Sequence, residues 1–424
     1  MFRFRAVPLF VVLCAPSLAM AQPAPTAVPS APTPMPSPIP TGALGPDDEK
    51  LLKEIEGEAR ATRPASPPPT APSGPGAGLS NLYNPAIALN GLFAAAAFSE
   101  SERPEPGAHD PQGTGFTLQN LELTLSANVD AYLRGDAHVI FTLEGVEVEE
   151  AYLTTLTLPG SLQVKAGQAF TPFGRQNKIH PHGWQFVDQN LVNVLLFGGD
   201  GLRNPGASLS WLAPLPVYTE LLGAVVHSRG ETAVSFLGET PEGVEERPID
   251  SADDLVYLGK LSLSFPIGPS LTVLGGVSGL AGPNPTAAYA STRIAGGDLY
   301  VKVKPASAIY AFGFLQAEVM AREYELADAD VQRDEGFYAM AGARVSRRLE
   351  VAVRGESVRS DRLLDPEALP WRNRFAGQVT FRPSEFSKLR LQGNYDVLPQ
   401  DADPILGGML QWEFLIGAHG AHAF

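Results

Sequence analysis

The sequence predicts an all-β fold: a transmembrane, antiparallel, up-and-down β-barrel of about 16 strands behind a disordered, Pro-rich N-terminal tether. Three observations predict this fold. The chain starts with an export signal, many segments alternate apolar and polar side chains, and short connections alternate with long ones. A tilted strand of about ten residues crosses a bilayer, and its alternation turns apolar side chains to lipid and polar ones to the lumen.

The composition agrees with a barrel and excludes other classes. Hydrophobic residues make up 44% of the 424 residues, and the mean hydropathy is −0.02. This is too polar for a bundle of transmembrane helices but normal for alternating strands. The formal net charge is −15, so we expect no nucleic-acid partner, because binding to phosphates needs a basic surface.

Residues 1–21 have the pattern of a secretory signal peptide. Arg3 and Arg5 form its basic start, an apolar core follows, and Ala19–Ala21 form an A-x-A cleavage site. The apolar core is too short to span a bilayer as a helix. It contains the single cysteine, Cys14, so the mature chain is expected to have neither a disulfide nor a thiolate metal site.

Residues 22–80 are rich in Pro, Ala, Ser and Thr, a composition that predicts an extended linker, here in the periplasm. Within the linker, residues 47–61 predict a short helical stretch, because acidic residues begin it and Leu51, Leu52 and Ile55 form an apolar stripe. Two interpretations stay open: a solvated helical turn or two, or a coiled-coil clasp for an oligomer.

Residues 84–424 form the predicted barrel. The clearest strand places Leu121 and Leu123 on one face and Asn120 and Glu122 on the other. The expected strands are 85–98, 115–129, 131–143, 147–158, 161–170, 205–213, 216–228, 254–265, 269–279, 292–304, 308–324, 335–346, 348–358, 372–382, 387–397 and 407–418. Short periplasmic turns alternate with long external loops, except that the link at 145–146 is short where a long loop is due.

The last expected strand, 407–418, closes the barrel by pairing with the first one, which removes both free edges. Its parity places Trp412 on the lipid face and Gln411 and Glu413 on the lumen face. The chain ends on an aromatic residue, Phe424, which is typical of the C-terminal signal that outer-membrane barrels present to the barrel-assembly machinery.

The longest structured connection, residues 171–204, follows the fifth expected strand. In sixteen-stranded general porins the loop at this position folds inward and narrows the pore. The apolar run 195–197 needs burial, which either inward folding or packing on the barrel rim would supply. If the loop folds inward, its constriction residues are Arg175, Lys178, His180, His182 and Asp188.

Charged side chains on the polar strand faces are candidates for the lumen. The foremost are Arg134, Asp136, Arg374, Arg382 and Arg390. Other basic candidates are Lys165, Lys260, Lys302, Lys304, Arg322, Arg344, Arg354 and Lys388. Other acidic candidates are Glu122, Glu149, Asp298, Glu318, Glu356, Asp396 and Glu413. Basic rings would attract anions, whereas pairs such as Arg134 with Asp136 would neutralise each other and stiffen the wall.

Two close histidine pairs, His180 with His182 and His419 with His422, have the donor type that zinc or copper prefers. We expect no cofactor other than a zinc ion at His180 and His182, and structural histidines are the alternative. His138 is the one histidine predicted on a polar strand face. No nucleophile-elbow, zinc-protease or phosphate-loop motif is present, so no enzymatic activity is expected.

The segment from the fourth to the fifth expected strand resembles porins of the phosphate-selective type, which combine an E-x-Y strand with a strand end in P-F-G. The matching positions are Glu150, Tyr152, Gly167, Pro172, Phe173 and Gly174. The chain is also similar to uncharacterised proteobacterial outer-membrane proteins, some of them labelled zinc-regulated. It lacks the lysine-rich ladder of phosphate porins and the plug domain of TonB-dependent receptors.

These observations together predict a porin-like channel in the Gram-negative outer membrane for passive passage of small polar solutes or ions. One alternative is a zinc-related outer-membrane protein, acting in metal uptake or responding to zinc. Another is a non-conducting structural barrel. The expected partners are outer-membrane lipid, the barrel-assembly machinery through Phe424, and small solutes or ions, and the analogy with general porins implies a homotrimer.

Overall fold

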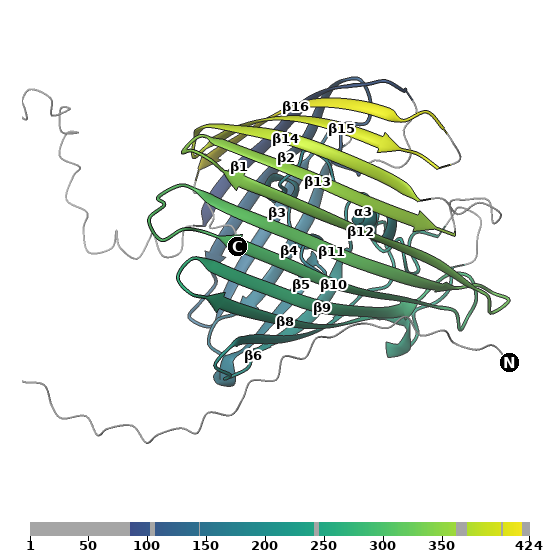
Figure 1. Ribbon diagram of the computed structural model, residues 1–424. Coiled ribbons are helices and arrows are strands. Elements are labelled where there is room, and N and C mark those ends of the chain that lie inside the picture. Colours follow the sequence, from purple (N-terminus) through teal and green to yellow (C-terminus); the bar gives the residue numbers. More distant parts are fainter. Residues whose placement is uncertain are drawn as a thin grey trace, which may run out of the picture. The chain divides into compact units, whose positions relative to one another are not determined.

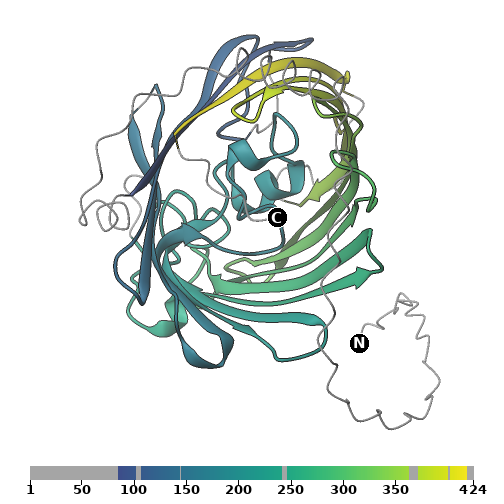
Figure 2. The ribbon, with the colours of Figure 1, turned by 90° about the vertical axis from the view of Figure 1, so that its left-hand side faces the viewer.

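The computed structural model describes residues 85–101, 107–143, 145–240, 246–361, 371–399 and 402–417. In this part the chain forms one closed barrel of antiparallel strands β1 to β16, each paired with its neighbours in sequence, and β1 (Ala86–Phe98) pairs with β16 (Ile405–Gly417) (Figure 1). Seen after a 90° turn, the strands form a ring (Figure 2). The predicted fold class and strand number are confirmed. The predicted signal peptide, the predicted linker with its helical stretch, the His419 and His422 pair, and Phe424 lie outside the described residues.

The other strands have the following bounds. They are β2 (Gly115–Asn128), β3 (Leu133–Phe141), β4 (Val146–Thr155), β5 (Leu162–Phe170), β6 (Arg203–Leu212), β7 (Tyr218–Val226), β8 (Val256–Ile267), β9 (Leu271–Pro283), β10 (Ser291–Val303), β11 (Phe312–Glu325), β12 (Val331–Arg344), β13 (Leu349–Ser360), β14 (Arg372–Ser384) and β15 (Ser387–Val397). The helical elements are η1 (Pro159–Ser161), η2 (Pro181–Gly183), α3 (Leu191–Phe197) and η3 (Ala252–Asp254). No helix in the described part of the chain is both long enough and apolar enough to cross a membrane.

Strand limits differ from the predicted ones by a few residues. The largest difference is four residues: β9 ends four residues later than predicted, β11 begins four residues later, and β12 begins four residues earlier. β12 begins four residues before the predicted limit because Val331 pairs with Glu325, and the ladder continues past the point where alternation stops. The short link expected between β3 and β4 is present, and the backbone N–H of Thr142 donates to the carbonyl of Gly145 across it.

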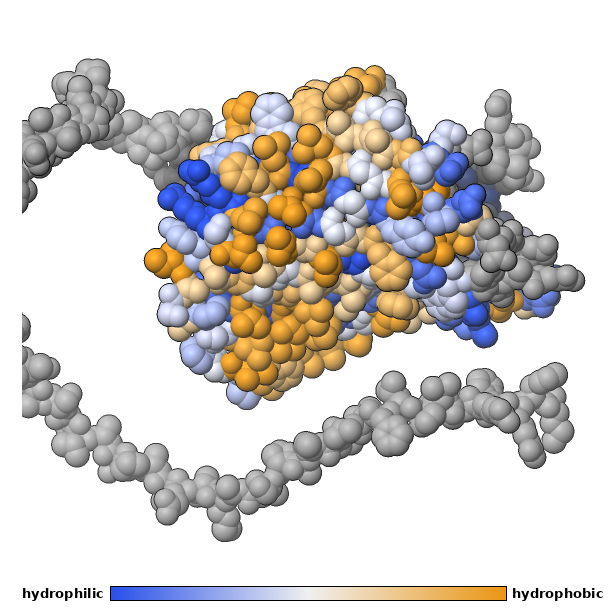
Figure 3. Space-filling model, turned by 45° about the horizontal axis from the view of Figure 1, so that its top comes forward, coloured by the Kyte–Doolittle hydropathy of each residue, from blue (hydrophilic) through white to orange (hydrophobic). Residues whose placement is uncertain are grey.

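The two faces of each strand meet different surroundings. On β15, Leu391 is 62% exposed, whereas its neighbours Arg390 and Gln392 are 3% and 2% exposed. On β16, Trp412 faces outward and Gln411 faces inward, as the parity of this strand predicts. Apolar side chains gather over the outer wall (Figure 3). A barrel with an apolar outer wall and a polar interior is suited to a bilayer rather than to water.

Candidate functional site

The long connection between β5 and β6 folds into the lumen, and we call residues 171–202 the inward loop. Its helix α3 lies inside the ring of strands (Figure 2). Asn190 caps this helix by accepting a hydrogen bond from the backbone N–H of Asn193 at 3.0 Å. The apolar side chains of Val192 and Leu196 are fully buried against the wall, so the lumen, not the barrel rim, buries this run.

Asp188 fastens the inward loop to β13, β14 and β15. Its carboxylate accepts hydrogen bonds from Arg354 at 2.7 Å, Gln392 at 2.6 Å and Asn394 at 2.7 Å, and it pairs with Arg374 at 3.2 Å. Burial alone would raise the pKa of Asp188, but the charges of Arg354 and Arg374 outweigh burial and hold that pKa well below its usual range. Asp188 is therefore a buried anion at neutral pH.

A second buried carboxylate, Asp110, joins the inward loop to the connection between β1 and β2. Its two oxygens accept the backbone N–H groups of Gln189 at 2.9 Å and Gly107 at 2.8 Å. Burial and the nearby negative charge of Asp188 raise the pKa of Asp110 to about 6. The docking of these two loops is therefore sensitive to protons just below neutral pH.

The start of the inward loop contacts β11, which lies halfway around the ring from β3. The backbone N–H of Arg175 donates to Glu318 at 2.5 Å, and its guanidinium donates to Gln316 at 3.0 Å. Gly174 has a φ of +55°, and a Cβ there would lie 2.2 Å from the Glu318 carboxylate. Glycine is required at this position both for its conformation and for the close approach.

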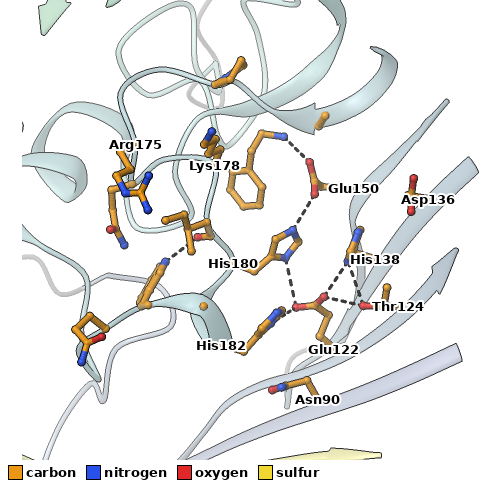
Figure 4. Close-up of a pocket in the computed structure, with 18 of the residues that line it drawn as sticks. Asn90, Glu122, Thr124, Asp136, His138, Glu150, Arg175, Lys178, His180 and His182 are labelled. Atoms are coloured by element: carbon orange, nitrogen blue, oxygen red, sulfur yellow. Dashed lines mark hydrogen bonds and ion pairs between the residues drawn. The ribbon is translucent and has the colours of Figure 1, made fainter. Parts of the chain in front are cut away.

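His180 lies where the inward loop meets β2 and β4 (Figure 4). Its Nδ1 is 2.7 Å from Glu149 Oε2 and 3.3 Å from Glu122 Oε2, and its Nε2 is 2.8 Å from Glu150 Oε2. Burial alone would lower the pKa of His180, but the charges of Glu149 and Glu122 outweigh burial and hold that pKa well above its usual range. A cation, either a proton or a metal ion, is favoured at this position.

Two further histidines share the Glu122 carboxylate. His138 Nδ1, from β3, lies 2.8 Å from Oε1, and His182 Nδ1 lies 3.0 Å from Oε2. The rings of His138 and His180 are 4.6 Å apart between centroids. We call this group the histidine–glutamate cluster; its members are Glu122, His138, Glu149, Glu150, His180 and His182. Within it, one ligand atom each from Glu122, His138 and His180 lie within 4.8 Å of one another, close enough to hold one metal ion.

A β-bulge brings two consecutive glutamates to the same face. Across β3 and β4, His138 pairs with Glu150 and Val139 pairs with Val148, so Glu149 is an extra residue with no partner of its own. Glu149 and Glu150 are both buried. Strict alternation placed only Glu149 on the polar face, and sequence reasoning found no carboxylate beside the histidines. The only sequence signals for Glu150 were the adjacent acidic pair and the E-x-Y resemblance.

The predicted strand charges mostly form ion pairs. Arg134 lies 2.9 Å from Asp136, which agrees with the alternative that such pairs neutralise each other. Arg382 pairs with Glu350 at 3.3 Å, and Arg390 pairs with Glu413 at 3.1 Å. Two of the predicted lumen residues, Asp188 and Arg374, lie between the inward loop and the wall and do not line the cavity described next.

A cavity of about 1420 Å³ occupies the lumen between the inward loop and the short turns. Four of the predicted constriction residues, Arg175, Lys178, His180 and His182, line it. That they narrow a pore stays a prediction. Among the described residues, eleven basic ones line it: Arg134, Lys165, Arg175, Lys178, Lys302, Arg344, Arg347, Arg348, Arg382, Lys388 and Arg390. Seven acidic ones of the same described ranges line it: Glu122, Asp136, Glu150, Glu220, Glu350, Glu385 and Glu413. The lining is therefore polar, with an excess of positive charge.

No family model matches the sequence. An uncharacterized protein of Aquifex aeolicus is 33% identical over 342 residues, which cover 73% of this chain and 70% of that protein. Three solved structures share the fold. OprB of Pseudomonas putida is 10% identical, with a TM-score of 0.53, and the match covers 80% of this chain and 95% of that chain. The outer-membrane channel DcaP of Acinetobacter baumannii is 15% identical, with a TM-score of 0.51, and the match covers 78% and 98%.

The third structure, the anion-selective porin from Comamonas acidovorans, is 9% identical, with a TM-score of 0.50, and the match covers 78% of this chain and all of that chain. At such low identities these matches establish the fold alone. That fold is the outer-membrane porin barrel, and the predicted porin-like resemblance is confirmed.

Proposed function

This chain belongs to the same family as the Aquifex aeolicus protein and has a porin-type barrel, and on that basis we propose that it is an outer-membrane channel for passive passage of small polar solutes or ions. The observation that carries the proposal is the cavity of about 1420 Å³, which charged side chains line inside a barrel with an apolar outer wall. A purely structural barrel has no need of a polar space of this size.

The inward loop supplies size exclusion in this proposal. It borders the cavity and is held by contacts to β2 and β4 at His180, to β11 at Arg175 and to β13 at Asp188. Because these three sets of contacts hold the loop inside the lumen, little of the lumen's cross-section is left open. The channel is therefore expected to have a low conductance and to exclude all but small solutes.

The test is electrical. Purified protein in a planar bilayer is expected to show discrete steps of conductance, and liposomes containing it are expected to swell in small sugars but not in large ones. Repeated silent reconstitutions of protein whose β-sheet circular dichroism is intact would reject the channel and support the non-conducting structural barrel instead.

A zinc-related function is the second candidate, as uptake of the metal or as a response to it. The histidine–glutamate cluster favours it, because His138, His180 and His182 face the cavity beside the Glu122 carboxylate. Liposomes that enclose a zinc-sensitive dye, and parallel liposomes that enclose a magnesium-sensitive dye, test uptake. Entry of zinc at a rate above that of magnesium supports the candidate, and equal rates reject selective uptake.

Partners follow from the same proposal. The apolar outer wall is suited to outer-membrane lipid, and the aromatic C-terminus, Phe424, is suited to recognition by the barrel-assembly machinery. Assembly is proposed as a homotrimer by analogy with general porins. Light scattering with subtraction of the detergent mass tests this, and a mass equal to one chain of 45.1 kDa, less the signal peptide, would reject it.

A further inference from the structure

We infer that Glu122, His138 and His180 bind one divalent transition-metal ion of the zinc type, which clamps the inward loop to the barrel wall. The inference names the ligands behind the second candidate function and rests on the same cluster. It concerns a bound ion rather than passage, so it stands or falls independently of conductance.

The donor set has the chemistry and spacing of such a site. Zinc takes imidazole nitrogen and carboxylate oxygen at about 2.0–2.2 Å, so ligand atoms around it lie roughly 3.5 Å apart. Here His180 Nδ1 is 3.3 Å from Glu122 Oε2, and His138 Nδ1 is 2.8 Å from Glu122 Oε1. Small rotations of these side chains would place an ion between them. Two imidazoles and one carboxylate are disfavoured by magnesium and calcium, which prefer oxygen ligands.

The orientation of His180 matches that of a metal-binding histidine. Its Nε2 lies 2.8 Å from Glu150 Oε2, and the other oxygen of Glu150 accepts the backbone N–H of Phe170 at 2.8 Å. A carboxylate that holds one ring nitrogen fixes the tautomer and turns the lone pair of the other nitrogen towards the metal. In His180 that other nitrogen is Nδ1, which faces Glu122 and His138 (Figure 4).

Glu149 supplies an independent indication that this point favours a cation. Its side chain is fully buried, and neither carboxylate oxygen has a hydrogen-bond donor among the described residues. Its Oε2 lies 2.7 Å from His180 Nδ1, at the proposed site. A buried carboxylate without donors is costly, and an ion at this point would satisfy it as a fourth ligand or as a counter-charge.

Charge balance points the same way. The cluster contains the carboxylates of Glu122, Glu149 and Glu150, and Lys165 lies 3.6 Å from Glu150. Within the described ranges, Glu122 and Glu149 form ion pairs with histidines alone. Glu122, His138 and His180 line the cavity, whereas Glu149 does not, so an ion could reach the three ligands from the lumen.

The experiment is calorimetric titration of zinc into the full mature barrel in detergent, with any affinity tag removed and metal first stripped with a chelator. One saturable site per chain is expected, with no binding of magnesium. Glu122→Gln and His138→Ala should each weaken zinc binding roughly 100-fold or more, and Glu150→Gln about 10–100-fold. The matched control is His227→Ala, a histidine in the connection between β7 and β8, which should leave affinity unchanged.

Three outcomes would overturn the inference. The first is an absence of saturable zinc binding by folded wild-type protein, which would leave a proton on His180 as the bridging cation. The second is binding that His182→Ala abolishes and His138→Ala leaves intact, which would reject the ligand set. The third is an extended X-ray absorption fine-structure spectrum of the bound zinc that lacks the scattering signal of imidazole ligands. Silent bilayers accompanied by zinc binding would reject the channel and leave the metal site standing.

Discussion

The Oδ1 of Asp188 on the inward loop lies 2.7 Å from Nη2 of Arg354 on β13, and the two residues are 166 positions apart in the chain. Both side chains are 3% exposed. The contact spans the lumen, because β13 lies halfway around the ring from β5, after which the inward loop begins. The ion pair therefore couples the position of the loop to the integrity of the wall.

Replacing Asp188→Ala is expected to loosen the inward loop by about 3 kcal/mol, because Arg354 and Arg374 lose a buried carboxylate. The variant should show a larger single-channel conductance and faster cleavage within the loop by an added protease. The matched control is Asp136→Ala, whose partner Arg134 is 50% exposed, so the change should cost less than about 1 kcal/mol. Equal behaviour of the two variants would contradict the role of Asp188.

The pKa of Asp110 predicts how pH affects loop docking. Its carboxyl has a pKa of about 6 in the folded protein against an ordinary 3.8, so the folded form binds the proton more tightly. Docking should strengthen as pH falls from about 6 to about 4, by up to roughly 3 kcal/mol, and weaken as pH rises through 6. Hydrogen exchange of the Gln189 and Gly107 amides, corrected for intrinsic rates, measures this.

The control for this pH effect is Asp110→Asn, which is neutral at every pH. Its loop protection should be independent of pH between 4 and 7, within the range where Asp188 stays ionised. If the wild type and this variant respond to pH in the same way, another group is responsible.

A charge on the lipid face tests the membrane orientation. Leu391 lies in the middle of β15 and is 62% exposed, so Leu391→Arg should destabilise the barrel in phospholipid vesicles by about 2–4 kcal/mol. Ser208→Arg is the matched control, because Ser208 lines the cavity and its new charge would stay in water. Urea unfolding in vesicles measures the stability of both variants. If Leu391→Arg is as stable as the wild type, this face does not contact lipid.

The excess of basic over acidic residues around the cavity predicts a preference for anions. Under a salt gradient, the reversal potential of the wild type should have the sign of anion selectivity. Arg347→Glu, which changes a charge in the cavity lining, should shift this potential towards cations. Arg293→Glu makes the same change on a side chain that does not line the cavity, and it should have little effect. The reverse order of effects would reject the cavity as the conduction path.

Much of the fold was predictable because strand alternation is a local property. Each side chain of β15 or β16 faces lipid or lumen according to its parity, so the alternation of apolar and polar residues along the sequence is enough to predict its face. The position of a long loop after the fifth strand likewise needed only a count of segments. Several of the residues that line the cavity, among them Arg175 and His180, belong to this loop.

The histidine–glutamate cluster was only half predictable. His180 and His182 stand out as a close pair, but their partners Glu122 and Glu149 come from strands up to about sixty residues earlier in the chain. No periodic pattern encodes which point of the wall a loop will contact. Glu150 was harder still, because a bulge breaks the period of two on which the prediction depended.

The sequence by itself determined that the chain forms a barrel with an apolar outside and a polar inside, because hydrophobic burial acts on every strand in the same way. Tertiary structure alone decided which lumen charges meet. Closure of β1 on β16 sets the register around the ring, and the inward loop then brings Asp188 to Arg354 and His180 to Glu122. Those contacts depend on the loop's path through the enclosed space, which no local pattern in the sequence specifies.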